Sequence, residues 1–243
     1  MSKRVLFLDI ETSPNLVYTW GLWKQDIALS QIVTPGQVLC WAAKFKGEKK
    51  MYWRGLPDGK MTMLQVAAGL LNLADVVVHF NGTTFDIPWL QGAFVAAKIA
   101  RPSPFTEVDL KKVAQRGFYL PSHKLEYLGR AFKIGAKVPH EGFPLWTACM
   151  AGDPAAWARM KKYNKGDVRL TESLYDKILP YISDHPHLGT PGTLECPRCG
   201  SVNTQARGTY HAKTRSYQRY QCQACASWFR GTRSMLSHHT TVI

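Results

Sequence analysis

A short apolar run followed at once by two acidic residues most constrains what this chain can fold into. Residues Val5 to Leu8 are four consecutive bulky apolar residues, a pattern typical of a short buried strand. Side chains alternate along a strand, so Asp9 and Glu11 emerge on the same face. Adjacent carboxylates repel each other unless a cation neutralises them, and oxygen ligands suit Mg²⁺ or Mn²⁺. For this pair alone, an acidic cap between a strand and a loop is an equal alternative.

Further acidic residues follow two later patterned segments. The apolar segment 75–78 leads to a turn at Asn81–Gly82, and Asp86 then lies in the first turn of an apolar helical segment. Far along the chain, Tyr163 and Asp167 are spaced i and i+4 in a segment with helical periodicity, so they share one helix face. The sequence therefore supplies four carboxylates and one tyrosine as candidate site residues.

Each of these residues also has a simpler interpretation. A tyrosine on a helix face commonly packs, so Tyr163 alone indicates little, and Asp167 alone would be a solvated acid. Asn81 fits a turn with no contact to substrate. Gly166 weakens a helix interior by roughly 1 kcal/mol relative to alanine, and we interpret it as a position where backbone or substrate approaches closely.

Taken in order, Asp9/Glu11, Asp86 and Tyr163-x-x-x-Asp167 resemble the three exonuclease motifs of the DEDD superfamily. The first two motifs read FLDIET at residues 7–12 and NGTTFDIP at residues 81–88. Tyrosine in the third motif marks the tyrosine subgroup, which includes the proofreading domains of B-family DNA polymerases. The histidine subgroup would place histidine five residues before the last aspartate, where this chain has lysine. The resemblance covers residues 3–184. Among the stand-alone members of the superfamily, the chain looks most like the small ribonuclease H-like predicted exonucleases of bacteria and their phages.

The resemblance implies a metal-dependent 3′→5′ exonuclease that hydrolyses phosphodiester bonds, with DNA the favoured substrate. Two Mg²⁺ or Mn²⁺ ions would be held by Asp9, Glu11, Asp86 and Asp167, and Tyr163 would orient the attacking water. The alternatives are an RNA-directed or structure-selective nuclease, and a non-catalytic nucleic-acid-binding protein. Four intact carboxylates argue against the pure binder, because such a protein gains nothing from anions beside a polyanionic ligand. The sequence leaves open a polymerase or replication partner and does not identify one.

The charge of the chain points to the same class of ligand. Lys and Arg number 31 and Asp and Glu 17, for a net charge of +14 in 243 residues. A polyanion, and nucleic acid above all, is the natural partner of so basic a chain, with a generic solubilising surface as the alternative. The first apolar run is too short for a signal peptide, and no apolar stretch approaches the roughly 20 residues that span a bilayer, so we expect no membrane contact and a cytoplasmic location.

Four cysteines near the C-terminus form a second constellation. They occur as two C-x2-C pairs separated by 22 residues: Cys196, Cys199, Cys222 and Cys225. Four thiolates give a closed tetrahedral shell for one structural Zn²⁺, and the arrangement resembles a zinc ribbon. Two disulfides are one alternative, which the expected cytoplasmic location disfavours, and an iron–sulfur centre, to which this spacing of two pairs is less suited, is another. The region between and after the pairs interleaves arginines with tyrosines, tryptophan and phenylalanine, which suits phosphate contact and base stacking, although about half of these rings should pack instead.

Periodicity and composition divide the chain into three parts. Residues 1–184 are expected to form a domain of α/β class, a mixed sheet flanked by helices, which is compatible with the ribonuclease H-like fold that the resemblance implies. A linker at 185–194 and a zinc ribbon with a basic tail at 195–243 follow. The predicted strands are residues 4–9, 16–22, 38–45, 76–80 and 105–110. The predicted helices are residues 61–73, 84–100, 124–132 and 164–181.

Five apolar or aromatic residues are assigned to the core by default. Cys40 and Cys149 lie in apolar surroundings and are expected to be inert. Trp20, Trp23 and Phe85 should pack in the core, with a pocket for the terminal base of a nucleic acid as the alternative.

Overall fold

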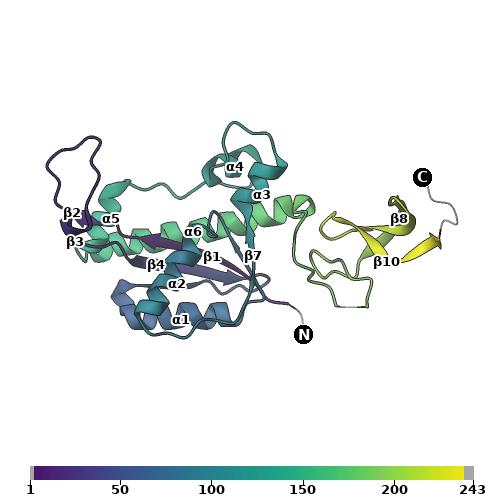
Figure 1. Ribbon diagram of the computed structural model, residues 1–243, viewed down its shortest axis with the longest axis horizontal. Coiled ribbons are helices and arrows are strands. Elements are labelled where there is room, and N and C mark those ends of the chain that lie inside the picture. Colours follow the sequence, from purple (N-terminus) through teal and green to yellow (C-terminus); the bar gives the residue numbers. More distant parts are fainter. Residues whose placement is uncertain (1–2, 191, 238–243) are drawn as a thin grey trace.

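A five-stranded mixed sheet forms the centre of the computed structural model, which describes residues 3–190 and 192–237 (Figure 1). Its strands are β1 (Val5–Thr12), β4 (Val38–Phe45), β5 (Tyr52–Gly55), β6 (Val76–His79) and β7 (Thr106–Asp109). They lie in the order β5-β4-β1-β6-β7. β1 is antiparallel to β4 and parallel to β6, so the sheet is mixed, as predicted.

Helices cover both faces of this sheet and bury a separate core cluster on each. One face is covered by α1 (Lys60–Asn72) and α2 (Asp86–Ala96). The other is covered by α3 (Leu110–Gly117), α4 (Leu125–Ala131), α5 (Phe143–Met150) and α6 (Pro154–Ile178). Short 3-10 turns occur at Leu29–Gln31, Leu56–Asp58 and Leu179–Tyr181. No helix within the described residues is long and apolar enough to cross a membrane.

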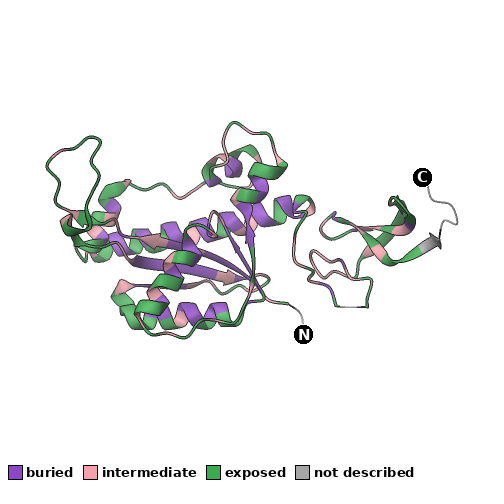
Figure 2. Ribbon diagram, viewed as in Figure 1, coloured by how far each residue is buried: buried purple, intermediate pink, exposed green. Residues whose placement is uncertain are grey.

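The central strand β1 divides its side chains between the two cores. Val5 and Phe7 belong to the cluster on the α6 side, whereas the even-numbered residues from Leu6 to Ile10 belong to the cluster under α1 and α2. The strand is deeply buried along this stretch (Figure 2). Because strand side chains alternate, Asp9 and Glu11 continue the odd-numbered series and face α6.

Helix α6 begins at Pro154 rather than at the predicted residue 164. The carboxylate of Asp153 accepts a hydrogen bond from the backbone N–H of Ala155 at 2.8 Å, which caps the helix, and proline suits the first helical position. The extra turns bring Trp157 and Met160 into the core. Among the strands of the central sheet and the helices that cover it, β5, α3 and α5 were not predicted; all three are short, although α3 buries Leu110, Val113 and Ala114 at helical spacing.

The predicted strand at residues 16–22 is wrong. Only Leu16–Val17 (β2) is extended, paired with β3 (Ile32–Thr34) in a separate two-stranded sheet. The apolar residues of the connecting loop do not enter a core: Trp20 is fully exposed and Trp23 is 86% exposed. Phe85 is 38% exposed and contacts Trp89 edge-on, so the default core assignment fails for all three aromatic residues.

The C-terminal region forms a second, three-stranded antiparallel sheet, which Figure 1 shows beyond the end of α6. Its strands are β8 (Thr204–His211), β9 (Arg215–Cys222) and β10 (Trp228–Ser237), with β9 in the middle. The preceding segment packs against the first domain. The buried hydroxyl of Tyr175 in α6 donates to Nε2 of His185 at 2.6 Å, and burial lowers the pKa of that histidine to about 4. Residues 238–243 of the predicted basic tail lie outside the described residues.

Candidate active site and metal centres

Three of the predicted carboxylates meet between β1 and α6. Asp9 and Glu11 leave β1 on the α6 side, and Asp167 points back from the middle of that helix. One carboxylate oxygen from each residue lies within 4.8 Å of the others. Asp167 is 2% exposed, and its Oδ1 is buried without a hydrogen-bond partner among the described residues. The strand alternation and the helix position that the sequence indicated therefore produce a real cluster.

The electrostatics of this cluster favour a bound cation. Burial, and then the charges of Glu11 and Asp86, raise the pKa of Asp9 well above its ordinary value. Burial and the charge of Asp167 raise the pKa of Glu11 to about 8. Buried anions placed this close are costly unless a positive ion accompanies them. An oxygen-only donor set with an orphaned carboxylate oxygen fits Mg²⁺ or Mn²⁺.

Asp86 lies beside this cluster but is not one of its three members. It begins α2, is 4% exposed, and its Oδ1 accepts the backbone N–H of Ile10 at 2.9 Å. Burial raises its pKa to about 6. One of its oxygens is therefore engaged by β1.

Lys137 enters the site from the irregular segment between α4 and α5, and no sequence pattern indicated it. Its Nζ donates to the hydroxyl of Tyr163 at 3.0 Å and to Oδ2 of Asp167 at 2.6 Å. Burial lowers the pKa of Lys137, but the negative charge of Asp167 outweighs it and holds that pKa above its ordinary value. The lysine is therefore charged at neutral pH, and it is the one basic group that touches both third-motif residues in the described structure.

Asn164 holds Asp9 in place. Its side-chain amide donates to the backbone carbonyl of Asp9 at 3.2 Å and to Oδ2 of the same residue at 2.7 Å. The residue is completely buried. Asn164 is three residues before Asp167 on the same helix face, so this spacing was a signal that could have identified it.

A network below the second motif shapes the edge of the site. Asn81 adopts φ 72°, and its backbone N–H donates to Oδ1 of Asp109 at 2.9 Å. Gly82 donates its backbone N–H to Nδ1 of the buried His79 at 3.0 Å, and a β-carbon on this glycine would stand 2.4 Å from the imidazole. Glu107 accepts from the other imidazole nitrogen at 3.0 Å. The turn predicted at Asn81–Gly82 is therefore rigidly braced by two strands.

A cleft of about 370 Å³ opens beside the acidic cluster. Asp9, Tyr163 and Asp167 line it together with Asn81. Lysines from three separate segments also reach it: Lys111, Lys124 and Lys137. An acidic floor with basic walls suits a divalent cation together with a phosphate group.

Comparison with known proteins agrees with this architecture. The family model for the RNase H superfamily matches residues 6–179. The chain belongs to the RNase H superfamily. It is also similar in structure to the family B DNA polymerase of the hyperthermophilic archaeon Pyrobaculum calidifontis, with a TM-score of 0.55 and 19% identity over 73% of this chain. The match spans 25% of the polymerase, so the chain corresponds to a part of that protein and shares its fold there. No curated protein matches the chain.

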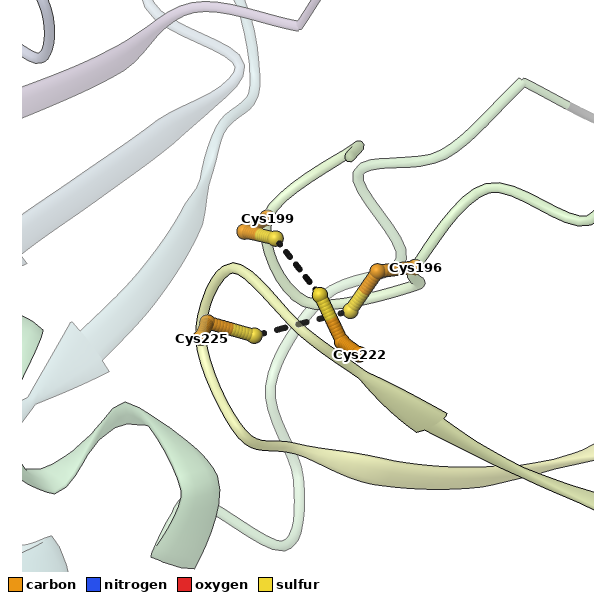
Figure 3. A group of neighbouring side chains, drawn as sticks. All are labelled: Cys196, Cys199, Cys222 and Cys225. Atoms are coloured by element: carbon orange, nitrogen blue, oxygen red, sulfur yellow. Dashed lines mark hydrogen bonds between the residues drawn. The ribbon is translucent and has the colours of Figure 1, made fainter. Parts of the chain in front are cut away.

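The four C-terminal cysteines lie outside the stretch matched to the RNase H superfamily, and they converge on one point (Figure 3). The Sγ atoms of Cys196 and Cys225 are 3.7 Å apart, and those of Cys199 and Cys222 are 3.6 Å apart. Four sulfurs at about 2.3 Å from one zinc would be separated by roughly 3.8 Å, whereas a disulfide requires about 2.05 Å. The geometry fits a tetrahedral zinc site and not the disulfide alternative.

The remaining two cysteines behave as core residues. Cys40 and Cys149 are buried in the cluster on the α6 side. Burial raises the pKa of Cys149 to about 11 and that of Cys40 well above its ordinary value. Both thiols are therefore protonated at neutral pH, which supports the expectation that they are inert.

Proposed function

We propose that this member of the RNase H superfamily is a metal-dependent 3′→5′ exonuclease that acts on nucleic acid, with DNA the favoured substrate. The observation that carries the proposal is the convergence of Asp9, Glu11 and Asp167, two of which, Asp9 and Asp167, line a cleft together with three lysines. The net charge of +14 supports a polyanionic substrate. The 3′→5′ polarity is inferred from the motif order and from tyrosine in the third motif.

The proposed metal ligands are Asp9, Glu11 and Asp167, with Asp86 assisting a second ion. Two divalent ions bound there would polarise the phosphate and acidify the attacking water. Asn164 fixes the carboxylate of Asp9 through its hydrogen bond, so that ligand is oriented before any ion arrives. The chain thus supplies a preorganised set of oxygen donors.

Tyr163 and Lys137 act on the substrate side of the cluster. We assign to the hydroxyl of Tyr163 the positioning of the nucleophilic water, and Lys137 orients that hydroxyl by donating to it. The lysine also places a positive charge where the scissile phosphate gains negative charge, which stabilises the transition state. His140 packs against the ring of Tyr163 at a centroid distance of 4.5 Å and limits its rotation.

The proposal is tested with single-stranded DNA, duplex DNA and RNA, each labelled at its 5′ end, in Mg²⁺, Mn²⁺ and excess chelator. A ladder that shortens from the 3′ end, only with a divalent ion and not with the Asp167→Asn variant, is expected. Internal cuts at a junction would indicate a structure-selective nuclease, and degradation of RNA alone would indicate an RNA-directed enzyme. Tight binding of nucleic acid without any hydrolysis in either metal would leave the non-catalytic alternative.

A further inference from the structure

The register of the C-terminal sheet sorts its aromatic and basic side chains by face. Tyr210 pairs with Tyr217, and Arg219 pairs with Arg230, at positions of the same parity along β9. Trp228 pairs with Gln221, two residues further on the same strand. Because side chains alternate along strands, these five residues share one face of the sheet, which we call the arginine face: Tyr210, Tyr217, Arg219, Trp228 and Arg230.

Contacts between the side chains confirm this assignment. The guanidinium of Arg230 lies 3.9 Å from the ring centroid of Tyr217 and 5.5 Å from that of Tyr210. The guanidinium of Arg219 lies 5.0 Å from the ring of Trp228, and its Nε donates to the backbone carbonyl of Arg207 at 2.9 Å. Both guanidinium groups therefore lie over aromatic rings, while the two arginine residues remain exposed.

The opposite face of the same sheet provides the packing. There Tyr220 and Phe229 stack on each other with centroids 5.4 Å apart and an interplanar angle of 18°. Ser216 and Cys222, also on this face, are buried. On the arginine face, by contrast, Tyr210 and Trp228 are 45% and 49% exposed. The division of rings between packing and exposure that the sequence predicted therefore follows the two faces of the sheet.

The charge of the arginine face is not neutralised within its own module. Glu195 is the last acidic residue of the sequence, so none follows among residues 196–243. Within the described structure, the ion pairs all involve residues that precede the cysteine cluster. A surface that combines exposed rings with unpaired arginines is complementary to a ligand with both flat bases and phosphates.

We propose that the arginine face binds single-stranded nucleic acid, with bases stacked on Trp228 and Tyr210 and phosphates contacted by Arg219 and Arg230. A single strand is favoured over a duplex because its bases are free to leave their own stack and lie on the rings. An arginine stacked on a ring keeps its N–H edge available for phosphate oxygens. This inference rests on the proposed function for the identity of the ligand class, but binding does not require hydrolysis.

The test is the anisotropy of a fluorescent 20-residue oligo(dT) and of a duplex of equal length, titrated with the full chain in Ca²⁺ over a range of salt concentrations. Arg230→Gln is compared with Lys213→Gln, which removes the same charge from the exposed turn between β8 and β9. Loss of one phosphate contact should reduce the log–log salt slope by about 0.7 in Arg230→Gln, with a smaller change in the lysine control. Trp228→Leu should raise Kd by about 5- to 150-fold and leave the salt slope unchanged, because stacking carries no counterion release.

Zinc content and thermal unfolding of each variant show whether the module is folded, and Tyr210→Leu serves as the second stacking variant if Trp228→Leu loses zinc. Equal changes in the salt slope for Arg230→Gln and Lys213→Gln, or tighter binding of duplex than of oligo(dT), would contradict the proposed role of the arginine face. The two proposals fail separately. If the wild-type chain hydrolyses nucleic acid but these variants bind it as tightly as the wild type, only the role of the arginine face is rejected. If the variants bind more weakly but the wild-type chain hydrolyses nothing, only the nuclease proposal is rejected.

Discussion

A β-carbon on Gly166 would stand 2.6 Å from Cγ2 of Val138, so only glycine allows these two residues their present approach. Val138 belongs to residues 133–142, which we call the site strap. The strap carries Lys137 and His140 against Tyr163. The glycine that weakens α6 is thus the position where the site strap lies on the helix, and the close approach is made by the side chain of Val138 and not by the backbone or substrate that the sequence suggested.

Gly166→Ala should displace the site strap and lower the rate of hydrolysis by about 10²-fold, because a shift of about 1 Å in a catalytic contact has that effect. Gly69→Ala is the matched control. It makes the same change inside helix α1, where an added β-carbon meets nothing within 4 Å, and should stabilise the fold by about 0.5–1 kcal/mol. Rates and thermal unfolding of both variants distinguish the outcomes. A Gly166→Ala chain with wild-type turnover would refute this role of the strap.

Lys137→Met should reduce kcat by about 10²–10³-fold, since it removes a fixed positive charge beside Asp167 and the donor to Tyr163. Lys137→Arg should recover part of that loss. Lys133→Met, an exposed lysine on the same strap, should leave the rate unchanged. Steady-state rates on a 3′-labelled strand measure the effect, and equal rates for the two methionine variants would contradict it.

Tyr163→Phe should lower turnover by about 10²-fold without abolishing it, because only the hydroxyl that Lys137 orients is lost. In the double variant with Lys137→Met, the two losses should not add, as expected for groups that act through one contact. Full additivity in the double-variant cycle would show that the lysine acts on the phosphate alone.

The acidic cluster predicts how stability depends on pH. Burial raises the pKa of Glu11 from 4.5 to about 8 in the folded chain, so the stabilisation that its protonation provides is complete below pH 4.5 and is lost as the pH rises through about 8. With zinc retained and Mg²⁺ omitted, the Tm should fall between pH 6 and 9, and Mg²⁺ should raise it more at pH 9 than at pH 6. Differential scanning fluorimetry measures both, and Glu11→Gln should flatten the slope. A metal-free Tm that rises over this range would contradict the prediction.

The cysteine cluster should bind about one zinc per chain, and loss of that zinc should destabilise the larger domain as well as the small sheet. Cys199 and Cys225 are packed against the core cluster on the α6 side, next to the junction of Tyr175 and His185. Cys199→Ser should therefore release zinc and also lower the Tm of the larger domain. Cys149→Ala, a core cysteine outside the cluster, should lower the Tm while zinc is retained. Zinc content measured with a chromogenic chelator checks the distinction.

Much of the fold was predictable where periodicity was strong. The alternation of β1 and the helical spacing of Tyr163 and Asp167 indicated both elements and the face that they share. The strand predicted at residues 16–22 failed because apolar residues there indicated burial, whereas the loop leaves Trp20 in solvent. Local pattern does not reveal whether a tertiary partner exists to cover an apolar segment.

The site was predictable to the extent that its residues belong to regular elements. Asp9, Glu11 and Asp167 come together as the sequence indicated, and the spacing of the four cysteines anticipated their convergence. Lys137 was not predictable, because it reaches the site from an irregular segment whose path depends on the absence of a side chain at Gly166. Contacts of this kind arise only when distant segments are folded together.

The register of β1 decides which of its side chains face the acidic site and which face the core under α1 and α2. Deleting one residue before Asp9 would turn both acids towards α1 and α2, and would bring Ile10 and Thr12 to the positions that Asp9 and Glu11 now occupy. Such a slip would bury two carboxylates without a cation and abolish the site in a single step. Core stability and metal affinity should therefore fall together whenever the register of β1 shifts by one residue.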